Sequence, residues 1–339
     1  MRILLVSPMY PSAAAPDFGA FVKQIADELE NQGHELSRAV IDHRGRSRAK
    51  YAGLTAAAVR EARRFRPDVV YAHFLVPGGT AGALAALAAR ARLVVTAHGR
   101  DVRNIGSMFG IGTLTRATLA HARVIAVSDY LRRELVAKLP ALEGRIDVID
   151  CGVDLERFQG QDGEEARRRV GWDGEGPRYL CLGTLDERKN VLRLAEAFER
   201  AETGSLAFVG DGPLRAQLEG RERVRLAGRV PHEQVADWIA ACEVLCQPSL
   251  VEPFGQALLE AMASERPVVA TRVGGPPEFV TPESGVLVDP ESVDSIAAGL
   301  KTALELPRPN AAARSAAAEH DVRRQAARVA EVLEGRRAE

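Results

Sequence analysis

The segment Pro248–Met262 has the clearest chemical potential in the chain, because it carries two glutamates, Glu252 and Glu260, behind a short apolar run. That run, Val244–Gln247, predicts a buried strand, and a helix is expected to begin near Gly255. Free backbone N–H groups at the start of such a helix bind anions. Glu260 would lie inside this helix, where its carboxylate can accept hydrogen bonds from two vicinal hydroxyls, such as those of a ribose. Alternatively, Glu252 caps the helix and Glu260 lies on its solvated side.

A second polar cluster, residues 183–190, follows the predicted strand Tyr179–Leu182 and contains Lys189. A lysine at the start of a helix can neutralise a diphosphate that also faces another helix start. The alternative interpretation of this cluster is a solvated turn.

Two residues of the first half follow predicted strands in the same way. His98 comes after the strand Leu93–Thr96 and could bond a substrate hydroxyl or be an ordinary loop residue. Gly19 lies between the strand Ile3–Val6 and a helix, where a phosphate could meet backbone amides.

The elements that must position these residues alternate between short apolar runs and longer stretches of helical period. This alternation is typical of parallel sheets with helices on both faces. It is broken at Gln159–Pro177, which is rich in glycine and charge, and then restarts. The expected strands are Ile3–Val6, Asp68–Ala72, Leu93–Thr96, Val124–Val127 and Asp147–Ile149 before the break, and Tyr179–Leu182, Leu206–Val209, Val224–Leu226, Val244–Gln247, Val268–Ala270 and Gly285–Leu287 after it.

The restart predicts an α/β protein of two tandem Rossmann-like, doubly wound domains. We expect an N-terminal domain over residues 1–158 and a C-terminal domain over residues 159–310, with the active site in the cleft between them. The tail has a helical repeat of apolar residues and is expected to form a closing helix.

Composition excludes several classes of protein. The chain has 339 residues, of which 46% are hydrophobic and 27% charged, and its formal net charge is -1. These values fit a globular protein with two cores and exclude a disordered, collagenous or coiled-coil chain. The near-neutral balance argues against nucleic-acid binding. The four cysteines lack the spacing of a metal site or a disulfide framework, so we expect reduced core residues.

The sequence predicts neither a secretory signal nor a membrane span. The apolar start, Ile3–Val6, is too short for a signal, and the Ala-rich stretch Gly78–Ala97 is interrupted by Arg90 and Arg92. We therefore expect a cytoplasmic protein.

One segment, Arg38–Arg66, is strongly basic. It holds nine basic and two acidic side chains, so its local balance is nine minus two, or +7. This favours peripheral attachment to the anionic inner face of the cell membrane, where a lipid-linked acceptor would be presented. The alternative is a solvated, arginine-rich helix.

The order of short motifs along nearly the whole chain resembles glycosyltransferase family 4. The motifs are Tyr10-Pro11 with Gly19, Gly33-His34, His98-Gly99-x-Asp101, Val127-Ser128, Gly152-Val153-Asp154 with Phe158, Gly183 with Lys189, Gly210-Asp211-Gly212-Pro213, Gly228-x-Val230, Pro248-Ser249, Glu252 to Glu260, and Gly274-Gly275-x-x-Glu278. The resemblance implies a GT-B fold, in which the C-terminal helix within residues 311–339 returns to the N-terminal domain.

The resemblance also implies an activity. A hexosyl group would pass from a UDP- or GDP-linked sugar to an acceptor with retention of anomeric configuration, and no metal ion or other cofactor would be required. The N-terminal stretch resembles the branch that builds bacterial surface polysaccharides such as teichuronic acid. The implied acceptor is therefore a glycan or a lipid-linked glycan.

Carried over position by position, the resemblance assigns a role to each matching residue. Glu260 would bind the donor ribose, Glu252 the hydroxyls of the transferred sugar, and Lys189 the diphosphate. His98 would contact the sugar, and Gly19 would approach the phosphate from the N-terminal domain. The remaining donor contacts would come from the backbone amides of Phe254, Gly255, Ala257 and Leu258 and from the base-pocket residues Val230 and Pro231.

One position departs from the family pattern, because relatives usually carry arginine directly after Gly183 and this chain has Thr184. Arg188 is the candidate substitute; otherwise the phosphate would be held more weakly. This departure keeps a catalytically inactive sugar-nucleotide-binding protein as an alternative.

Two other enzyme classes are alternatives to a glycosyltransferase. A nucleotide-sugar 2-epimerase of the same fold would use the same cleft with different acid and base residues. An NAD-dependent oxidoreductase expects G-x-G-x-x-G after the first strand, where this chain has Ser7-Pro8-Met9-Tyr10-Pro11.

Overall fold

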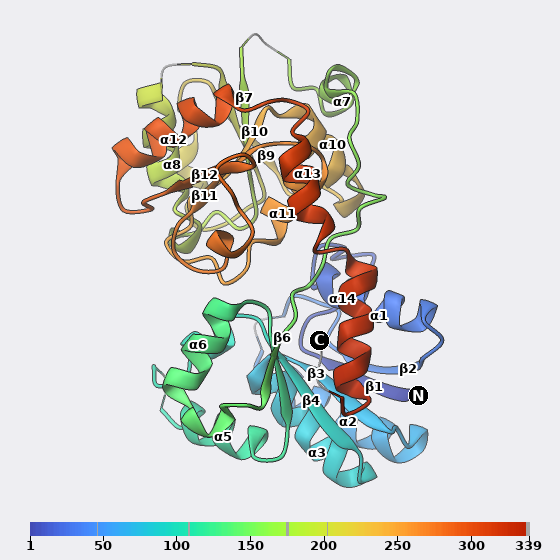
Figure 1. The fold of residues 1–339 in the computed structure, drawn as a ribbon. Helices are drawn as coiled ribbons and strands as arrows, with labels where there is room; N and C mark the ends of the chain where they lie inside the picture. Colours follow the sequence, from blue (N-terminus) through green and yellow to red (C-terminus); the bar gives the residue numbers. More distant parts are fainter. Residues whose placement is uncertain (46, 108, 174–175, 202, 337–339) are drawn as a thin grey trace. The chain divides into compact units, whose positions relative to one another are not determined.

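The computed structural model describes residues 1–339 except 46, 108, 174–175, 202 and 337–339 (Figure 1). The chain forms two compact units, Met1–Gly152 with Val322–Glu339, and Val153–Asp321. The predicted boundary lies after residue 158, and the predicted return of the tail starts at residue 311. In the structure α13 (Ala311–Ala318) belongs to the second unit, because it packs against α11 (Gln256–Ala263). The return to the first unit begins with α14 (Val322–Leu333).

The described part of the first unit is built on a six-stranded sheet in the order β2-β1-β3-β4-β5-β6, and every pairing is parallel. Its strands are β1 (Arg2–Ser7), β2 (Glu35–Val40), β3 (Val69–His73), β4 (Arg92–Ala97), β5 (Arg123–Ala126) and β6 (Ile146–Val148). The five strands predicted from apolar runs are confirmed. β2 was missed, since it is an edge strand whose mostly half-exposed residues form no apolar run.

Helices cover both faces of this sheet, which is why its central strands are mostly apolar and buried (Figure 1). On one face, α1 packs against α14, and both contact a core that includes Ile3, Leu5 and Tyr71. On the other face, α3 lies over Val70 and Ala72 and packs against α2 and α5. The remaining helix bounds in this unit are α1 (Ala20–Asn31), α2 (Ala49–Phe65), α3 (Thr80–Ala89), α4 (Arg100–Arg103), α5 (Ile111–Leu119) and α6 (Asp129–Lys138), with short turns Leu75–Gly79 and Pro140–Leu142.

The described part of the second unit has a second six-stranded parallel sheet, in the order β12-β11-β10-β7-β8-β9. Its strands are β7 (Arg178–Leu182), β8 (Ser205–Val209), β9 (Val224–Gly228), β10 (Val244–Gln247), β11 (Val268–Thr271) and β12 (Gly285–Val288). All six predicted strands are confirmed. The predicted α/β fold of two doubly wound domains is therefore present.

Helices also cover both faces of the second sheet. One face packs against α8 and α12 around a core that includes Tyr179, Phe198 and Phe208. The helix bounds are α7 (Gly163–Val170), α8 (Val191–Ala201), α9 (Arg215–Leu218), α10 (Val235–Ala241) and α12 (Val293–Glu305), with short turns Glu187–Lys189, His232–Gln234 and Pro276–Glu278.

Two expectations from composition can be compared with the described residues. No helix among them is both long enough and apolar enough to span a bilayer. The cysteines Cys151, Cys181, Cys242 and Cys246 are free thiols, and burial raises the pKa of the Cys181 and Cys242 thiols to about 12. Cys181, Cys242 and Cys246 are buried, as expected of core residues, whereas Cys151 is half-buried.

Candidate functional site

The topology of the second sheet marks one place for a ligand. The chain enters the sheet at β7, adds β8 and β9 on one side, and then returns to place β10, β11 and β12 on the other side. The strand order therefore reverses between β7 and β10, and open parallel sheets bind ligands at the carboxyl ends of strands that flank such a reversal. The Lys189 cluster follows β7 and the Glu252 segment follows β10. The topology thus brings both predicted clusters to this edge.

Local hydrogen bonds fix the Lys189 turn. The side chain of Asp186 accepts a hydrogen bond from the backbone N–H of Lys189 at 2.9 Å. Asn190 then turns the chain with a φ of 59°, in the left-handed region that asparagine tolerates better than most residues. Its buried amide donates to the carbonyls of Pro248 (3.0 Å) and Pro290 (2.7 Å), which ties the turn to the loop after β10. Sequence reasoning missed Asn190; a polar residue directly after a predicted phosphate-binding lysine was the available signal.

Lys189 and Glu252 meet as a buried ion pair. The Lys189 Nζ atom lies 2.7 Å from Glu252 Oε2, and the two side chains are only 13% and 9% exposed. Arg188 Nη1 lies 3.9 Å from the same oxygen, and the Ser249 hydroxyl donates to it at 3.0 Å. Ser249 is a second residue that the sequence analysis assigned no role. Lys189 and Arg188 therefore form a cationic cluster around one buried carboxylate.

The electrostatics of this cluster keep Glu252 ionised. Burial alone would raise the pKa of the Glu252 carboxyl, but the Lys189 ammonium, the Arg188 guanidinium and the Ser249 hydroxyl outweigh burial and hold the pKa below its ordinary value. A carboxylate held in this state can only accept hydrogen bonds, so it suits the hydroxyls of a polyol.

The loop after β11 holds the backbone of Glu252 in place. The Glu252 N–H donates to the Val273 carbonyl at 3.1 Å, and the Gly275 N–H donates to the Glu252 carbonyl at 2.9 Å. Gly274 has a φ of 119°, and a Cβ atom at this position would lie 2.0 Å from the Glu252 carbonyl oxygen. Only glycine therefore allows the loop after β11 to approach the loop after β10 so closely.

The start of α11 is open to a ligand. Gly255 is its N-cap with a φ of 112°, and among the described residues no side chain caps this helix. The Leu258 amide donates within the first turn to the Gly255 carbonyl at 2.9 Å. Of the predicted amide donors, Leu258 is therefore already engaged, whereas the roles of Phe254, Gly255 and Ala257 remain predictions that this geometry allows.

Glu260 lies in the same helix and is 9% exposed. Burial raises the pKa of its carboxyl to about 7, and this rise is opposed by the charge of Arg157 and by a hydrogen bond with Gln256. The alternative interpretation, a solvated position for Glu260, is therefore wrong. The carboxyl is buried, and its protonation state changes near neutral pH.

The other predicted donor residues have different environments. Thr184 is exposed directly after β7, and Val230 and Pro231 follow β9, the edge strand. Arg188 is 31% exposed and faces the Glu252 carboxylate, as a substitute for a missing arginine would. The roles of these four residues stay predictions.

In the first unit, the strand order reverses between β1 and β3, and Gly19 and His98 follow β1 and β4. Gly19 is the N-cap of α1 with a φ of 81°, and a Cβ atom there would lie 2.7 Å from the Met9 carbonyl. His98 is partly exposed, and its Nε2 atom lies 3.0 Å from Nδ1 of His73. Neither residue's predicted contact with a donor is tested by these distances.

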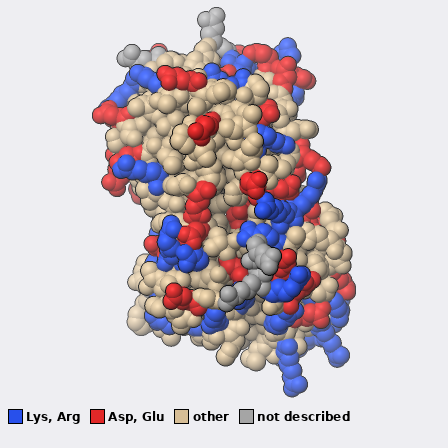
Figure 2. Space-filling model, in the orientation of Figure 1, with Lys and Arg blue, Asp and Glu red and all other residues tan. Residues whose placement is uncertain are grey.

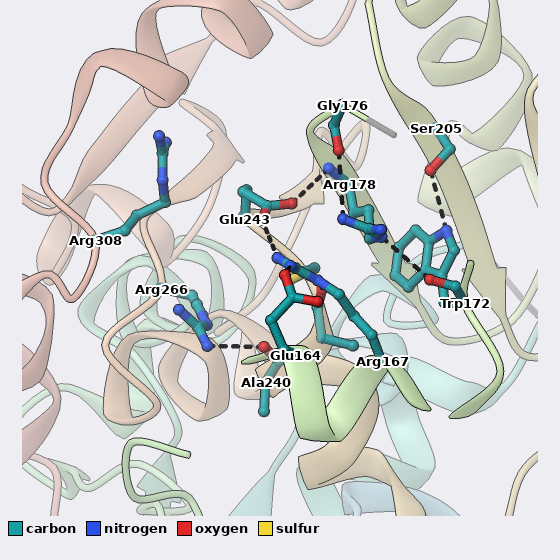
Figure 3. A network of polar contacts seen from close by, with 12 residues as sticks. Glu164, Arg167, Trp172, Gly176, Arg178, Ser205, Ala240, Glu243, Arg266 and Arg308 are labelled. Carbon is teal, nitrogen blue, oxygen red and sulfur yellow. Dashed lines mark hydrogen bonds and ion pairs between the residues drawn. The ribbon is translucent and has the colours of Figure 1, made fainter. Parts of the chain in front are cut away.

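A separate polar network lies at the opposite, amino-terminal edge of the second sheet (Figure 3). Arg167 of α7 contacts both Glu164 and Glu243, and Glu243 also accepts from the Arg178 N–H at 2.6 Å. Arg266 donates to the Ala240 carbonyl at 2.7 Å. Glu164, Arg167, Glu243 and Arg266 line a cavity of about 560 Å³. Since Glu164 and Glu243 already pair with Arg167, we interpret the network as structural: it holds α7 against the sheet.

Both halves of the chain match models of known protein families. The family described as "Glycosyl transferases group 1" matches residues 162–320, and the family described as "Glycosyltransferase Family 4" matches residues 18–157. A Bacillus subtilis protein named as a teichuronic acid biosynthesis glycosyltransferase is 29% identical over 88% of this chain and 87% of its own length. A GDP-mannose-dependent alpha-(1-6)-phosphatidylinositol monomannoside mannosyltransferase of Mycolicibacterium smegmatis is 31% identical over 80% of this chain and 77% of its own length.

A solved structure shows the same fold. Alr3699/HepE of Anabaena, in complex with UDP-glucose, superposes with a TM-score of 0.79 and 22% identity, over 98% of this chain and 99% of that chain. Two parallel α/β units with these relatives identify the fold as GT-B. The chain belongs to glycosyltransferase family 4.

Proposed function

We propose that this protein is a retaining glycosyltransferase that moves a hexosyl group from a nucleotide-diphosphate sugar to a glycan or lipid-linked acceptor. The observation that carries the proposal is the buried Lys189–Glu252 pair at the sheet edge where the strand order reverses. Relatives that use GDP-mannose or are solved with UDP-glucose support a UDP- or GDP-linked donor. The Bacillus subtilis relative supports a role in the synthesis of a cell-surface polysaccharide or glycolipid.

The chemistry follows from the charges. When the bond between the sugar C1 and the diphosphate oxygen breaks, negative charge develops on the diphosphate and positive charge on the sugar ring. Lys189, Arg188 and the open start of α11 would stabilise the leaving diphosphate without a metal ion. The acceptor oxygen would bond to C1 on the face from which the diphosphate departs, and a phosphate oxygen would take the acceptor's proton.

Donor binding would rearrange the resting ion pair. The diphosphate would take over the Lys189 ammonium, and the Glu252 carboxylate would turn to hydroxyls of the sugar. In the same proposal Glu260 binds the ribose, Val230 and Pro231 line the base pocket, and His98 and Gly19 contact the sugar and the phosphate.

The direct test is donor binding followed by product analysis. UDP-glucose, GDP-mannose and an ADP-linked sugar are added separately, and the melting temperature of the protein is measured with each. A donor at 100 times its Kd should stabilise the native protein by about 2.7 kcal/mol. We expect one nucleotide class to raise the melting temperature and to be hydrolysed slowly without an acceptor.

The alternatives give different products. A 2-epimerase would release an epimeric sugar nucleotide, or its free sugar, whereas an inactive binding protein would bind the donor without turnover. If none of the three nucleotide classes bound, the proposed function would be wrong.

We also propose peripheral attachment to the inner membrane, through a smaller part of the basic segment Arg38–Arg66 than its total charge suggests. Within the basic segment Arg38–Arg66, Arg38 pairs with Glu30 and Arg44 pairs with Asp17, while Arg46 lies outside the described residues. The charge available to a membrane is therefore smaller than the sequence count. The exposed helix α2 keeps Arg60 and Arg63, for which the described residues provide no carboxylate within ion-pair distance.

The same unit carries exposed apolar side chains on or next to α3 and α5. α2 packs against α3, and α3 packs against α5. Figure 2 shows lysine and arginine side chains at the end of the first unit where Figure 1 draws α2 and α3. On α3 and α5, the large exposed apolar side chains are Leu84 (46% exposed), Leu87 (77%) and Leu114 (40%). Phe109, just before α5, is fully exposed. A surface that carries both arginines and exposed apolar side chains suits binding to an anionic bilayer.

Substitution of the two arginines tests this attachment. Arg60→Ala with Arg63→Ala should weaken binding to phosphatidylglycerol vesicles, since each basic residue contributes about 1 kcal/mol near an anionic surface. Two such contributions correspond to roughly a 30-fold loss at low salt. Co-sedimentation measures binding, and Arg168→Ala in the second unit is the control. Equal binding to phosphatidylcholine and phosphatidylglycerol vesicles would contradict the proposal.

A further inference from the structure

Two histidines meet at the carboxyl edge of the first sheet. β3 and β4 are neighbours, with His73 in register with Thr96, so the chain brings His73 and His98 to the same edge. His73 Nδ1 lies 3.0 Å from His98 Nε2, and the ring planes differ by only 19° with ring centres 5.3 Å apart. Rings that meet edge to edge in nearly one plane satisfy the directional requirement of an N–H···N hydrogen bond.

Both rings are uncharged at neutral pH. Burial lowers the pKa of His98 to about 3, and burial together with the nearby His98 lowers the pKa of His73 well below its ordinary value. A neutral imidazole carries one N–H and one acceptor nitrogen. The contact therefore contains one proton, and one ring donates while the other accepts.

The surroundings of His73 indicate which ring donates. His73 is 2% exposed, and its Nε2 atom is buried without a hydrogen-bond partner among the described residues. A cavity of about 10 Å³ beside the rings is at the lower limit of the space that one water molecule needs. If His98 donated, His73 would carry its own N–H on this isolated nitrogen. Buried N–H groups without a partner are rarer in proteins than unpaired acceptors, so donation by His73 is favoured.

The loops around the pair restrict His98 further. Asp101 accepts hydrogen bonds from the backbone N–H of Leu75 (2.9 Å), which follows β3, and of Gly99 (2.8 Å), which follows β4. The ring centres of Phe21 and Phe74 lie 4.9 and 4.6 Å from the ring centre of His98. With Nε2 taken by His73, the ring nitrogen of His98 left for a ligand is Nδ1.

We propose that His73 is a positioning residue that fixes His98 in the Nδ1–H form, so that His98 donates a hydrogen bond to an oxygen of the donor sugar. This role rests on the proposed function, in which His98 contacts the transferred sugar. His73 itself touches no substrate. It sets which nitrogen of His98 carries the proton and in which direction that N–H points.

The tautomer is measured on the ligand-free protein. The chain has seven histidines, so selective 15N-histidine labelling gives a small set of ring signals, which His73→Asn and His98→Asn assign. We expect His98 to show a protonated Nδ1 and an acceptor Nε2, and His73 to show the same pattern. A protonated Nε2 on His98 would overturn the proposal, whatever the activity of the preparation.

Two matched variants test positioning by kinetics. Asparagine can place an amide N–H near the position of His73 Nδ1, whereas leucine of similar size cannot donate. We expect His73→Asn to keep kcat/KM within about threefold and His73→Leu to lower it about tenfold. In His73→Leu, the ring signals of His98 should change to a tautomer mixture.

The control is His43→Leu, an exposed histidine, which should change neither measurement. Unaltered His98 signals in a folded His73→Leu protein would refute the positioning role. Absence of transferase activity in every form, with the expected tautomer present, would refute the proposed function and leave the tautomer assignment standing.

Discussion

Lys189→Ala is expected to lower the turnover number at least a hundredfold. The diphosphate would lose the ammonium that balances its developing charge, and one such contact is worth on the order of 3 kcal/mol of transition-state stabilisation. The measurement is the initial rate at saturating donor. A folded variant whose turnover number stays within tenfold of the wild-type value would exclude the proposed role of Lys189.

The same substitution should also destabilise the resting protein, which the sequence analysis did not anticipate. Lys189 and Glu252 form a buried pair, and removal of one partner from such a pair costs about 3 to 5 kcal/mol. Arg188, 3.9 Å from Glu252, should reduce this loss toward the lower value. The double variant Lys189→Met with Glu252→Gln removes both charges. We expect it to recover most of the thermal stability and none of the activity, which separates catalysis from folding.

Glu260→Gln should make the ligand-free protein more stable and its donor binding weaker. Burial raises the pKa of Glu260 from its ordinary value of 4.5 to about 7. The folded protein therefore holds a proton that the unfolded chain releases between these pH values, and the free energy of unfolding falls as the pH rises through this window. The free energy of unfolding of the wild type is reduced by up to about 3 kcal/mol above pH 7, and the glutamine variant does not show this reduction.

Melting temperatures and donor affinities at several pH values test this second prediction. At pH 8 the variant should melt several degrees higher than the wild type, and near pH 4 the two should coincide. Loss of a charged acceptor for the ribose should weaken donor binding roughly tenfold or more at pH 8. Wild-type affinity should itself rise between pH 6 and pH 8, as Glu260 ionises. Glu291→Gln, at an exposed position, is the control, and a pH-independent difference in melting temperature would contradict the assignment.

The fold was largely predictable because its determinants are local. Eleven apolar runs predicted strands, and the structure has a strand at each of these positions. β2 was not predicted, since an edge strand with exposed residues carries no continuous apolar signal. The end of the second unit was misplaced, because the packing of α13 against α11 depends on contacts between segments far apart in the sequence.

The candidate site was predictable in its parts but not in its contacts. Lys189 and Glu252 were each found at the end of a strand, but their ion pair requires β7 and β10 to be neighbours, which the sequence does not state. Burial of Glu260 likewise depends on what covers α11. The charge of Arg38–Arg66 was overestimated for a related reason, since the partners Asp17 and Glu30 lie outside that segment.

The close approach of Gly274 to Glu252 has a consequence for protein engineering. Backbone hydrogen bonds join Glu252 to Val273 and Gly275, and a side chain at Gly274 would have no space beside Glu252. The loops 248–255 and 271–278 therefore depend on each other for their geometry. A chimera that exchanges the first loop with that of a relative of different donor preference should keep its geometry only if the second loop is exchanged with it. If the Glu252 loop binds the donor as proposed, its contribution to donor binding therefore depends on two neighbouring stretches of the sequence that must be exchanged together.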